Sequence, residues 1–350
     1  MQSPTPNLHF PNLHFPNLHS PIGFLTAYVP EELFHAAGFT PVFIFHTPDD
    51  HGYARAHLPG FTCWIAGSAL DQALAGELDG LAGMALAQTC DTMQGLTDLW
   101  RRNVPHIPLF HFGMPLRLDG PSARAYLLAE LRSLRERVQA VTGRPISDDA
   151  LRESIALYNR TRTLVRRLYT HAADFAPPDL YALVWAALSS TPLPPCSPAP
   201  LPSCSSAPLL LLVGSALADP VLFDVIAQVG ARVAGDLLDL GERYFAVDAA
   251  EDGDPLEAIA DRLLALVPTP TKHHPQHTRT AHLLSLVRER NADGVIFARQ
   301  KFCEPYGFDY VQLAHALDQV GVPHLLVELE QASQAGQLRT RVEAFVEMLA

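Results

Sequence analysis

The chain has 350 residues, 48% apolar and 18% charged, so it is long enough for two globular domains with cores of ordinary size. Its net charge of −12 disfavours a nucleic-acid partner, and no apolar run reaches the roughly 20 residues that span a bilayer. Five cysteines, an odd number, favour a reducing compartment over a disulfide framework. No basic and apolar leader is visible, so we expect a cytoplasmic protein without a membrane segment.

A tandem repeat occupies the beginning of the chain. The pentapeptide Asn-Leu-His-Phe-Pro occurs at residues 7–11 and 12–16 and starts again at 17–19. A proline every five residues breaks both helix and strand, so residues 1–20 are predicted to be a disordered tail. Three histidines in the repeat are possible weak metal ligands, but a tail without a role is the favoured interpretation.

Residues 21–188 alternate between extended and helical patterns and are predicted to form an N-terminal lobe. Strands are expected at residues 22–29, 41–45, 81–87 and 107–112. Helices are expected at residues 31–37, 70–78, 96–102, 123–141 and 148–169. The last two helices are long and amphipathic, so we expect a helical segment between this lobe and the next.

A Pro/Ser-rich stretch at residues 189–208 has no periodic pattern and is predicted to be a linker. It contains Cys196 and Cys204, and a flexible prolyl chain is a poor support for fixed ligands. Residues 209–350 form the predicted C-terminal lobe. Strands are expected there at 208–213, 232–234, 295–298 and 324–328, and helices at 221–229, 256–266, 280–290, 309–320 and 338–348.

The alternation predicts an α/β fold with two Rossmann-like or flavodoxin-like lobes, each a parallel sheet covered by helices on both faces. The two halves also resemble each other in order. Asp-Gly, a strand, a cysteine, a helix, Val-Pro-His and a further strand occur at residues 79–112 and again from residue 293. Ten residues separate glycine from cysteine in the first copy and nine in the second, which suggests a duplicated lobe.

Cys90 and Cys303 each follow a predicted strand, at the sheet edge where open α/β proteins build their sites. Cys63 precedes the helix that leads to the Cys90 strand. Three thiolates far apart in the sequence fit an iron–sulfur site between two lobes, with one iron left without a protein thiolate. From the spacing alone, three buried, inert cysteines are the favoured interpretation.

Other site motifs are missing from the sequence. It has no GxGxxG dinucleotide loop, no GxxxxGK[ST] phosphate loop and no GxSxG elbow, so the chain is not expected to hydrolyse ATP. The histidines at 273, 274 and 277 are interpreted as part of a solvated loop, and His106 and His324 as structural residues. For His35 the sequence does not distinguish a position in the core from a position in a cleft.

Six stretches resemble the 2-hydroxyacyl-CoA dehydratase/benzoyl-CoA reductase family, and its smaller, β-type subunits in particular. The resemblance extends from about residue 22 to the C-terminus. The most specific runs are Lys-Phe-Cys-Glu-Pro-Tyr-Gly-Phe-Asp-Tyr at 301–310 and Gly-Gln-Leu-Arg-Thr-Arg-Val-Glu-Ala-Phe at 336–345. The others lie at residues 28–42, 89–91, 157–160 and 292–296.

The resemblance implies a [4Fe–4S] cluster on Cys63, Cys90 and Cys303, a related second subunit, an ATP-dependent iron–sulfur activator and an acyl-CoA substrate that loses water through a ketyl radical. Asp91 and Glu304, next to ligand cysteines, are the candidates for proton handling, although a role in capping the following helix fits them as well.

The resemblance leaves alternatives open. These are a benzoyl-CoA reductase-type subunit and a non-catalytic scaffold or electron-transfer paralogue. The sequence also departs from the family after Cys63, where Trp-Ile-Ala-Gly stands in place of a proline and a later basic residue. This departure puts partner or substrate contacts near Cys63 in doubt.

Overall fold

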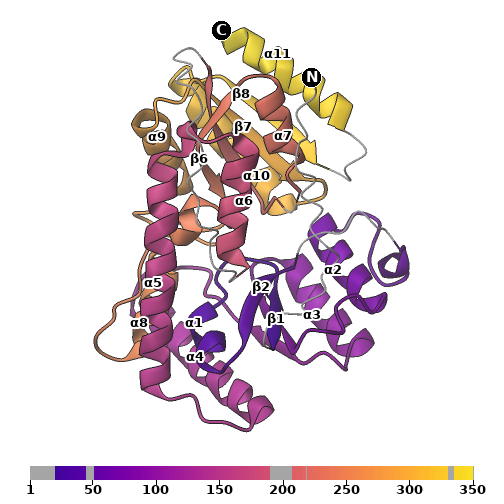
Figure 1. The fold of residues 1–350 in the computed structure, drawn as a ribbon, viewed down its shortest axis with the longest axis vertical. Coiled ribbons are helices and arrows are strands. Elements are labelled where there is room, and N and C mark those ends of the chain that lie inside the picture. Colours follow the sequence, from indigo (N-terminus) through magenta and orange to yellow (C-terminus); the bar gives the residue numbers. More distant parts are fainter. Residues whose placement is uncertain (1–19, 45–50, 190–206, 218, 330–334, 350) are drawn as a thin grey trace.

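A computed structural model describes residues 20–44, 51–189, 207–217, 219–329 and 335–349. Most of the predicted tail and linker, with Cys196 and Cys204, lie outside the described residues. Within them, two four-stranded parallel sheets lie one above the other, with helices packed around both (Figure 1). The prediction of an α/β fold with two lobes is confirmed.

The N-terminal sheet has the order β2-β1-β3-β4 and the C-terminal sheet the order β6-β5-β7-β8, so the two share one topology. In both sheets the strand order reverses beside the first strand of the lobe, β1 or β5, as in flavodoxin-like folds. The strands are β1 (Pro21–Phe24), β2 (Thr40–Phe43), β3 (Gly83–Ala87), β4 (Leu109–Phe112), β5 (Leu209–Gly214), β6 (Arg232–Leu238), β7 (Gly294–Gln300) and β8 (His324–Leu329). The similarity of the two halves that the sequence suggested is thus repeated in the strand order.

In the N-terminal half the helices are α1 (Glu31–Ala36), α2 (Trp64–Leu74), α3 (Asp91–Asn103), α4 (Pro121–Thr142), α5 (Asp148–Thr170) and α6 (Pro177–Leu188), with short 3₁₀ turns η1 (Tyr53–Ala56) and η2 (Ala172–Asp174). In the C-terminal half they are α7 (Val221–Gln228), α8 (Pro255–Ala265), α9 (Arg279–Glu289), α10 (Glu304–Gln319) and α11 (Ala335–Leu349), with the 3₁₀ turn η3 (Glu242–Phe245).

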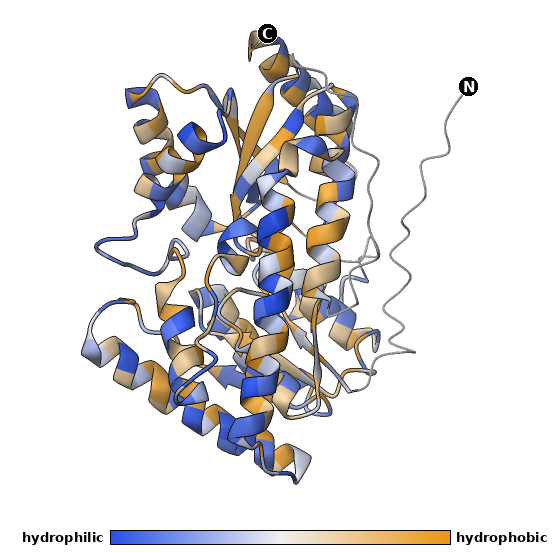
Figure 2. Cartoon of the chain, turned by 60° about the vertical axis from the view of Figure 1, so that its left-hand side comes forward, coloured by the Kyte–Doolittle hydropathy of each residue, from blue (hydrophilic) through white to orange (hydrophobic). Residues whose placement is uncertain are grey.

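Several helices begin at a residue whose side chain caps the first free backbone amides. The hydroxyl of Ser147 accepts a hydrogen bond from the Ala150 amide at the head of α5. Asp254 does the same for two amides of α8, and Thr278 for one amide of α9. At the other end of α4, Gly143 takes the left-handed conformation that closes a helix. The long α5 shows alternating polar and apolar residues along its length (Figure 2), as expected for a helix with one buried face.

One buried apolar cluster runs through both lobes and includes Phe24, Leu131 and Leu212. Two smaller clusters cover the other faces of the two sheets, one around Trp100 and one around Leu286. Because the largest cluster is shared, the lobes are fixed to each other by a common core. No helix among the described residues has the length and apolar character that a membrane crossing requires.

The structure corrects several element predictions, most of them in bounds. Strand β1 stops at Phe24, and β6 extends beyond the predicted 232–234 to Leu238. Helix α2 spans Trp64–Leu74 rather than 70–78, and α10 begins at Glu304 rather than 309. Helix α6 was not predicted at all. It links the lobes, because its Trp185 ring lies 4.7 Å from Phe43 and its Tyr181 ring 5.0 Å from Phe223.

Candidate functional site

The three cysteines occupy equivalent local positions, each at the N-cap of a helix. Cys63 precedes α2, Cys90 precedes α3 and Cys303 precedes α10. Cys90 and Cys303 each stand three residues beyond the end of a central strand, β3 and β7 respectively. Amides at a helix N-terminus and the helix dipole stabilise negative charge, so at each position the helix start opposes the effect of burial on the thiol.

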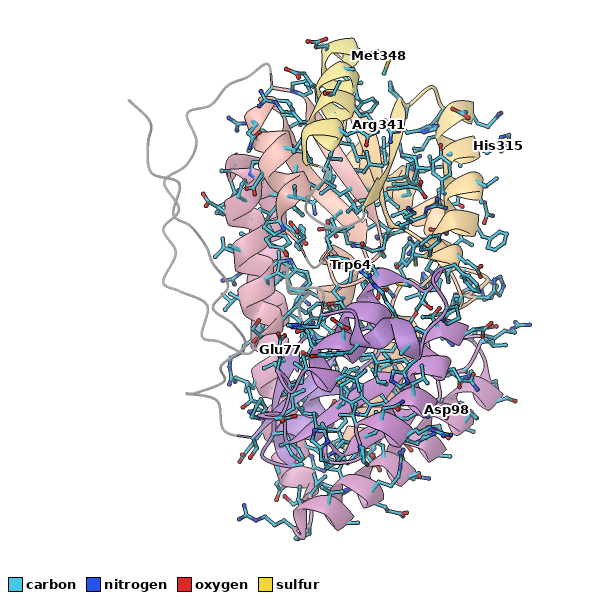
Figure 3. The ribbon with its side chains drawn as sticks, turned by 90° about the vertical axis from the view of Figure 1, so that its right-hand side faces the viewer. Trp64, Glu77, Asp98, His315, Arg341 and Met348 are labelled. Carbon is cyan, nitrogen blue, oxygen red and sulfur yellow. The ribbon has the colours of Figure 1, made fainter. Side chains whose placement is uncertain are left out.

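The fold brings these thiols together from opposite lobes. Cys63 and Cys303 share a hydrogen bond, and Cys90 interacts electrostatically with both. Cys63 is buried, whereas the other two are partly exposed, and none forms a disulfide. Trp64, the neighbour of Cys63, lies where the lobes meet (Figure 3). The predicted convergence of distant cysteines is therefore present in the structure.

The thiols differ in how readily they lose a proton. The hydrogen bond from Cys303, together with the amides of Ile65 and Ala66, lowers the pKa of Cys63, although burial opposes this. The same hydrogen bond and burial raise the pKa of Cys303, and burial raises the pKa of Cys90. Cys303 is therefore the donor of the pair, and Cys63 is the thiol that ionises most easily.

A pocket of about 300 Å³ opens beside Cys90, with walls from both lobes. Asp91 and Thr92 line it from α3, and Glu304 and Phe308 from α10. The two carboxylates named from sequence therefore face the same pocket, each in the first turn of its helix. That position suits a helix dipole as well as a site, so their role in proton transfer stays a prediction.

A segment between α8 and α9 closes this pocket and was not recognised from sequence. Lys272 is buried, and its ammonium donates to the carbonyl oxygens of Gln88 (3.1 Å) and Met114 (3.2 Å) at the ends of β3 and β4. The Thr271 hydroxyl donates to the carbonyl of Thr89. Burial lowers the pKa of Lys272 to about 8, while Cys90 opposes the shift.

A buried carboxylate, that of Asp239, also connects the two lobes. Asp239, just after β6, accepts hydrogen bonds from the Tyr306 hydroxyl (3.1 Å), the Arg243 guanidinium (3.3 Å) and the Ala27 amide (3.4 Å). Tyr306 belongs to the first turns of α10, and Ala27 to the loop after β1. Asp239 thereby fixes α10, which carries Cys303 at its start, against the N-terminal lobe. An isolated aspartate after a strand gave no signal in the sequence.

The histidines singled out in the sequence hydrogen-bond to other residues or lie in the α8–α9 segment. His35 hydrogen-bonds Ser154 at 2.8 Å between α1 and α5, so it packs in the helical region. His106 pairs with Asp79, and His324 pairs with Asp318 beside two aromatic rings, as expected of structural residues. In the α8–α9 segment His273 and His277 are exposed and His274 is partly exposed, in agreement with the solvated-loop interpretation.

Residues from two of the stretches that resemble the family, 28–42 and 157–160, form buried structural contacts. Glu32, from the stretch at 28–42, pairs with Arg162, which also donates to Asn159 of the stretch at 157–160. Asn159 in turn hydrogen-bonds Ala249 in both directions, at 2.8 and 3.1 Å. These contacts join the two lobes below the site rather than forming part of it.

No group of three or more His, Cys, Asp or Glu side chains in the described ranges is arranged to hold a metal ion. The three thiols meet, but as a hydrogen-bonded pair with a third thiol beside it. The assignment of Cys63, Cys90 and Cys303 as cluster ligands therefore stays a prediction.

Comparison with known proteins places nearly the whole chain in one group. Residues 26–349 match the family described as 2-hydroxyglutaryl-CoA dehydratase, D-component. The (R)-phenyllactyl-CoA dehydratase beta subunit of Clostridium sporogenes is 25% identical, covering 94% of this chain and 91% of the relative. The beta subunit of lactoyl-CoA dehydratase from Anaerotignum propionicum is 27% identical with the same coverages. A benzoyl-CoA reductase subunit of Thauera aromatica is 27% identical, over 91% of this chain and 87% of the relative.

Proposed function

Because the chain belongs to the 2-hydroxyglutaryl-CoA dehydratase D-component family, we propose that it is the smaller, β-type subunit of a 2-hydroxyacyl-CoA dehydratase-type complex. In this proposal it holds a [4Fe–4S] cluster on Cys63, Cys90 and Cys303. The observation that carries the proposal is the meeting of three free thiols, from two lobes, at three helix N-termini.

The donor set fits an iron–sulfur group in kind. Thiolates are the usual protein ligands of such clusters, and helix N-termini favour the thiolate form. A ligand sulfur must be deprotonated, so the proton that Cys303 shares with Cys63 would leave on binding. Three protein thiolates would leave one iron for a ligand that is not a cysteine. Burial around Cys63 would keep water from this side of the cluster.

The bound cluster would supply a single electron for reduction of an acyl-CoA thioester, as a step towards loss of water from a 2-hydroxyacyl-CoA. The chain's own residues then have three tasks. Asp239 holds α10 and its Cys303 in place across the lobes. The aromatic ring of Phe308 forms part of the wall of the pocket beside Cys90, and Asp91 and Glu304, which line the same pocket, are the candidates for proton handling there.

Partners follow from the same proposal. The three relatives reported above are named as subunits of dehydratases or of a reductase, two of them as beta subunits. We infer a related second subunit and a separate ATP-dependent iron–sulfur activator, because this chain has no phosphate-binding loop of its own.

Purification without oxygen tests the proposal. We expect a brown protein with about four irons and four sulfides per chain and an EPR signal after reduction with dithionite. A colourless protein that stays free of iron after reconstitution would contradict the cluster and favour the scaffold alternative.

A benzoyl-CoA reductase-type subunit remains the second candidate, since the Thauera relative is as similar as the lactoyl-CoA dehydratase subunit. With the partner and activator present, the dehydratase converts a 2-hydroxyacyl-CoA without net electron consumption. A reductase instead consumes two electrons for each product molecule, so stoichiometric consumption of dithionite separates the two.

A further inference from the structure

The second residue of helix α10 differs in kind from its counterparts in α2 and α3. Each of these helices begins directly after a cysteine, and its second residue is Ile65 in α2, Thr92 in α3 and Pro305 in α10. Isoleucine and threonine each have a backbone N–H, whereas proline has none. The helix that follows Cys303 therefore lacks an amide that the other two helices have.

The missing amide matters because amides at these positions act on the cysteine sulfur. In α2 and α3 the backbone amides of the second and third residues both stabilise negative charge on the sulfur. They are Ile65 and Ala66 for Cys63, and Thr92 and Met93 for Cys90. In α10 the third residue, Tyr306, acts in this way on Cys303. In the part of the chain that the structure describes, none of the three cysteines closes an ordinary cap hydrogen bond, so the amides act as partial positive charges at the helix start.

The first amide of α10 does not replace the missing one. Glu304 donates its N–H to the carbonyl oxygen of Phe302 at 3.1 Å, back along the chain. Nor does the start of a helix require proline at the second position, because Pro121 of α4 and Pro255 of α8 stand at the first. Pro305 stands one residue later, where an amide would act on the sulfur, and so has an electrostatic effect that a helix start does not need.

We propose that Pro305 lowers the reduction potential of the bound cluster, because it leaves the sulfur of Cys303 without the second-position amide that acts on the other two sulfurs. The cluster itself belongs to the proposed function, on which this inference rests. Pro305 acts through the sulfur of Cys303 and touches no reacting group. It therefore sets an electronic property of the site and takes no direct part in the chemistry.

The direction of the effect follows from charge. Reduction adds one electron, so the reduced cluster and its thiolates carry more negative charge than the oxidised form. An amide that faces a ligand sulfur stabilises the reduced form more than the oxidised form, and so raises the potential. The absence of one such amide lowers the potential. A low potential suits a centre that has to pass an electron to a thioester, which is a weak electron acceptor.

A redox titration of the full chain tests the proposal. Pro305→Ala supplies an amide at the second position and keeps a residue that fits a helix. The protein is purified without oxygen, reduced stepwise with dithionite in the presence of mediators, and followed by EPR. We expect the equilibrium constant of one-electron reduction to rise roughly tenfold, which corresponds to an increase of about 59 mV in the midpoint potential. An unchanged or lower potential would overturn the proposal.

The reciprocal change is available in α3. Thr92→Pro removes the equivalent amide beside Cys90 and should lower the equilibrium constant of reduction roughly tenfold, whereas Thr92→Ala, the matched control, keeps the amide and should leave the potential unchanged. Opposite shifts in Pro305→Ala and Thr92→Pro separate an amide effect from a general loosening of the site, which would move both potentials in one direction. If Thr92→Pro does not fold, Pro305→Ala and Thr92→Ala still decide. Shifts of the same sign would contradict the role of Pro305.

Thiol labelling of the cluster-free chain gives a readout that needs no iron. The thiolate is the form that reacts with iodoacetamide, so Pro305→Ala should label Cys303 roughly threefold faster or more and leave Cys90 unchanged, as read by mass spectrometry. An unchanged rate at Cys303 would refute the effect of the missing amide.

Iron content is measured on the same preparations, so that the two proposals fail separately. A chain that holds iron, with the same potential in Pro305→Ala as in the unchanged chain, refutes the role of Pro305 alone. A chain that takes up no iron refutes the cluster and, with it, the effect on potential, and the labelling then decides whether Pro305 deprives the sulfur of an amide.

Discussion

The carboxylate of Glu32, in α1, pairs with the guanidinium of Arg162, in α5, at a place where the two side chains are 0% and 2% exposed. A second guanidinium, from Arg262, stands 3.9 Å from the same carboxylate. Burial alone would raise the pKa of Glu32, but Arg162 and Arg262 outweigh it and lower the pKa. One buried anion thus balances two buried cations from different lobes, at the junction between α1, α5 and α8.

We expect Glu32→Gln to cost roughly 3–5 kcal/mol of unfolding free energy, since it removes the main counter-charge of two buried cations. Urea denaturation followed by circular dichroism measures the loss. The matched control is Asp248→Asn, which breaks the partly exposed pair with Arg166 and should cost about 1 kcal/mol or less. Equal losses in the two variants would contradict the importance assigned to the buried pair.

The neighbouring Glu31 makes stability depend on pH in a defined window. It is fully buried, and burial raises its pKa from 4.5 to about 7, although the hydroxyl of Tyr244 donates to it at 2.6 Å. The folded chain therefore binds this proton more tightly than the unfolded chain. Its stabilising contribution is complete below pH 4.5 and is lost as the pH rises towards and beyond 7, by about 3 kcal/mol in total.

Glu31→Gln should remove that part of the dependence, because a neutral amide still accepts from Tyr244. The difference in unfolding free energy between the variant and the unchanged chain should therefore shift in favour of the variant from pH 5 to pH 8. Urea denaturation midpoints of both chains at the two pH values measure this shift. The comparison is between variants because burial also raises the pKa of Glu242 to about 7, in the same window. Glu257→Gln, at the exposed pair with Arg124, is the control that should leave the pH profile unchanged.

The residue before Cys303 has a strained backbone. Phe302 has a φ of +63°, in the left-handed region that favours glycine, and its side chain is half exposed. Phe302→Gly should be more stable than Phe302→Ala by roughly 0.5–1 kcal/mol, because both lose the ring but only glycine relieves the strain. Chemical denaturation of the two variants gives the difference.

The preference for glycine over alanine should reverse at Gly95, an exposed glycine within α3 that has open space around it and no positive φ. There alanine should be the more stable residue by roughly 0.5–1 kcal/mol. Alanine favoured at both positions would show that Phe302 is not strained in solution.

The ligand prediction is tested by serine substitutions. Changing Cys63, Cys90 or Cys303 singly should remove most of the bound iron, because a hard hydroxyl replaces a thiolate at a site for soft ligands. Iron is measured colorimetrically after purification without oxygen. Cys196→Ser and Cys204→Ser, in the linker predicted from sequence, should keep full iron content. A loss at Cys204 as large as that at Cys303 would refute the three-ligand set.

The α/β fold with two lobes was predictable because the spacing of apolar residues distinguishes strands from helices along the chain. Prediction failed where local chemistry overrides that signal. Helix α10 begins at Glu304 because Pro305 fits the first turn of a helix, whereas in a sequence pattern proline is taken as a stop. Strand β6 continues through Asp236, whose carboxylate accepts a hydrogen bond from the Tyr169 hydroxyl at 2.5 Å. An aspartate inside an apolar run gives no hint that such a partner will be present.

The site was predictable in part for a related reason. Cysteines at strand ends can be found by counting residues, so the convergence of Cys90 and Cys303 was foreseen. Lys272 was not, because its role depends on the carbonyls of Gln88 and Met114, which lie 184 and 158 residues away in the chain. The strand predicted at 22–29 stops at Phe24, and the turn that follows includes Tyr28, whose φ of +72° is in the left-handed region that a strand does not use.

The shared strand order of the two sheets also explains why the number of thiols is odd. By order of elements, α2 before β3 corresponds to α9 before β7, so the position equivalent to Cys63 is Thr278. Thr278 caps α9 by accepting from the Ala281 amide at 3.1 Å. The second lobe thus has a hydroxyl at the helix cap where the first has a thiol, and two of the three thiols come from the first lobe and one from the second.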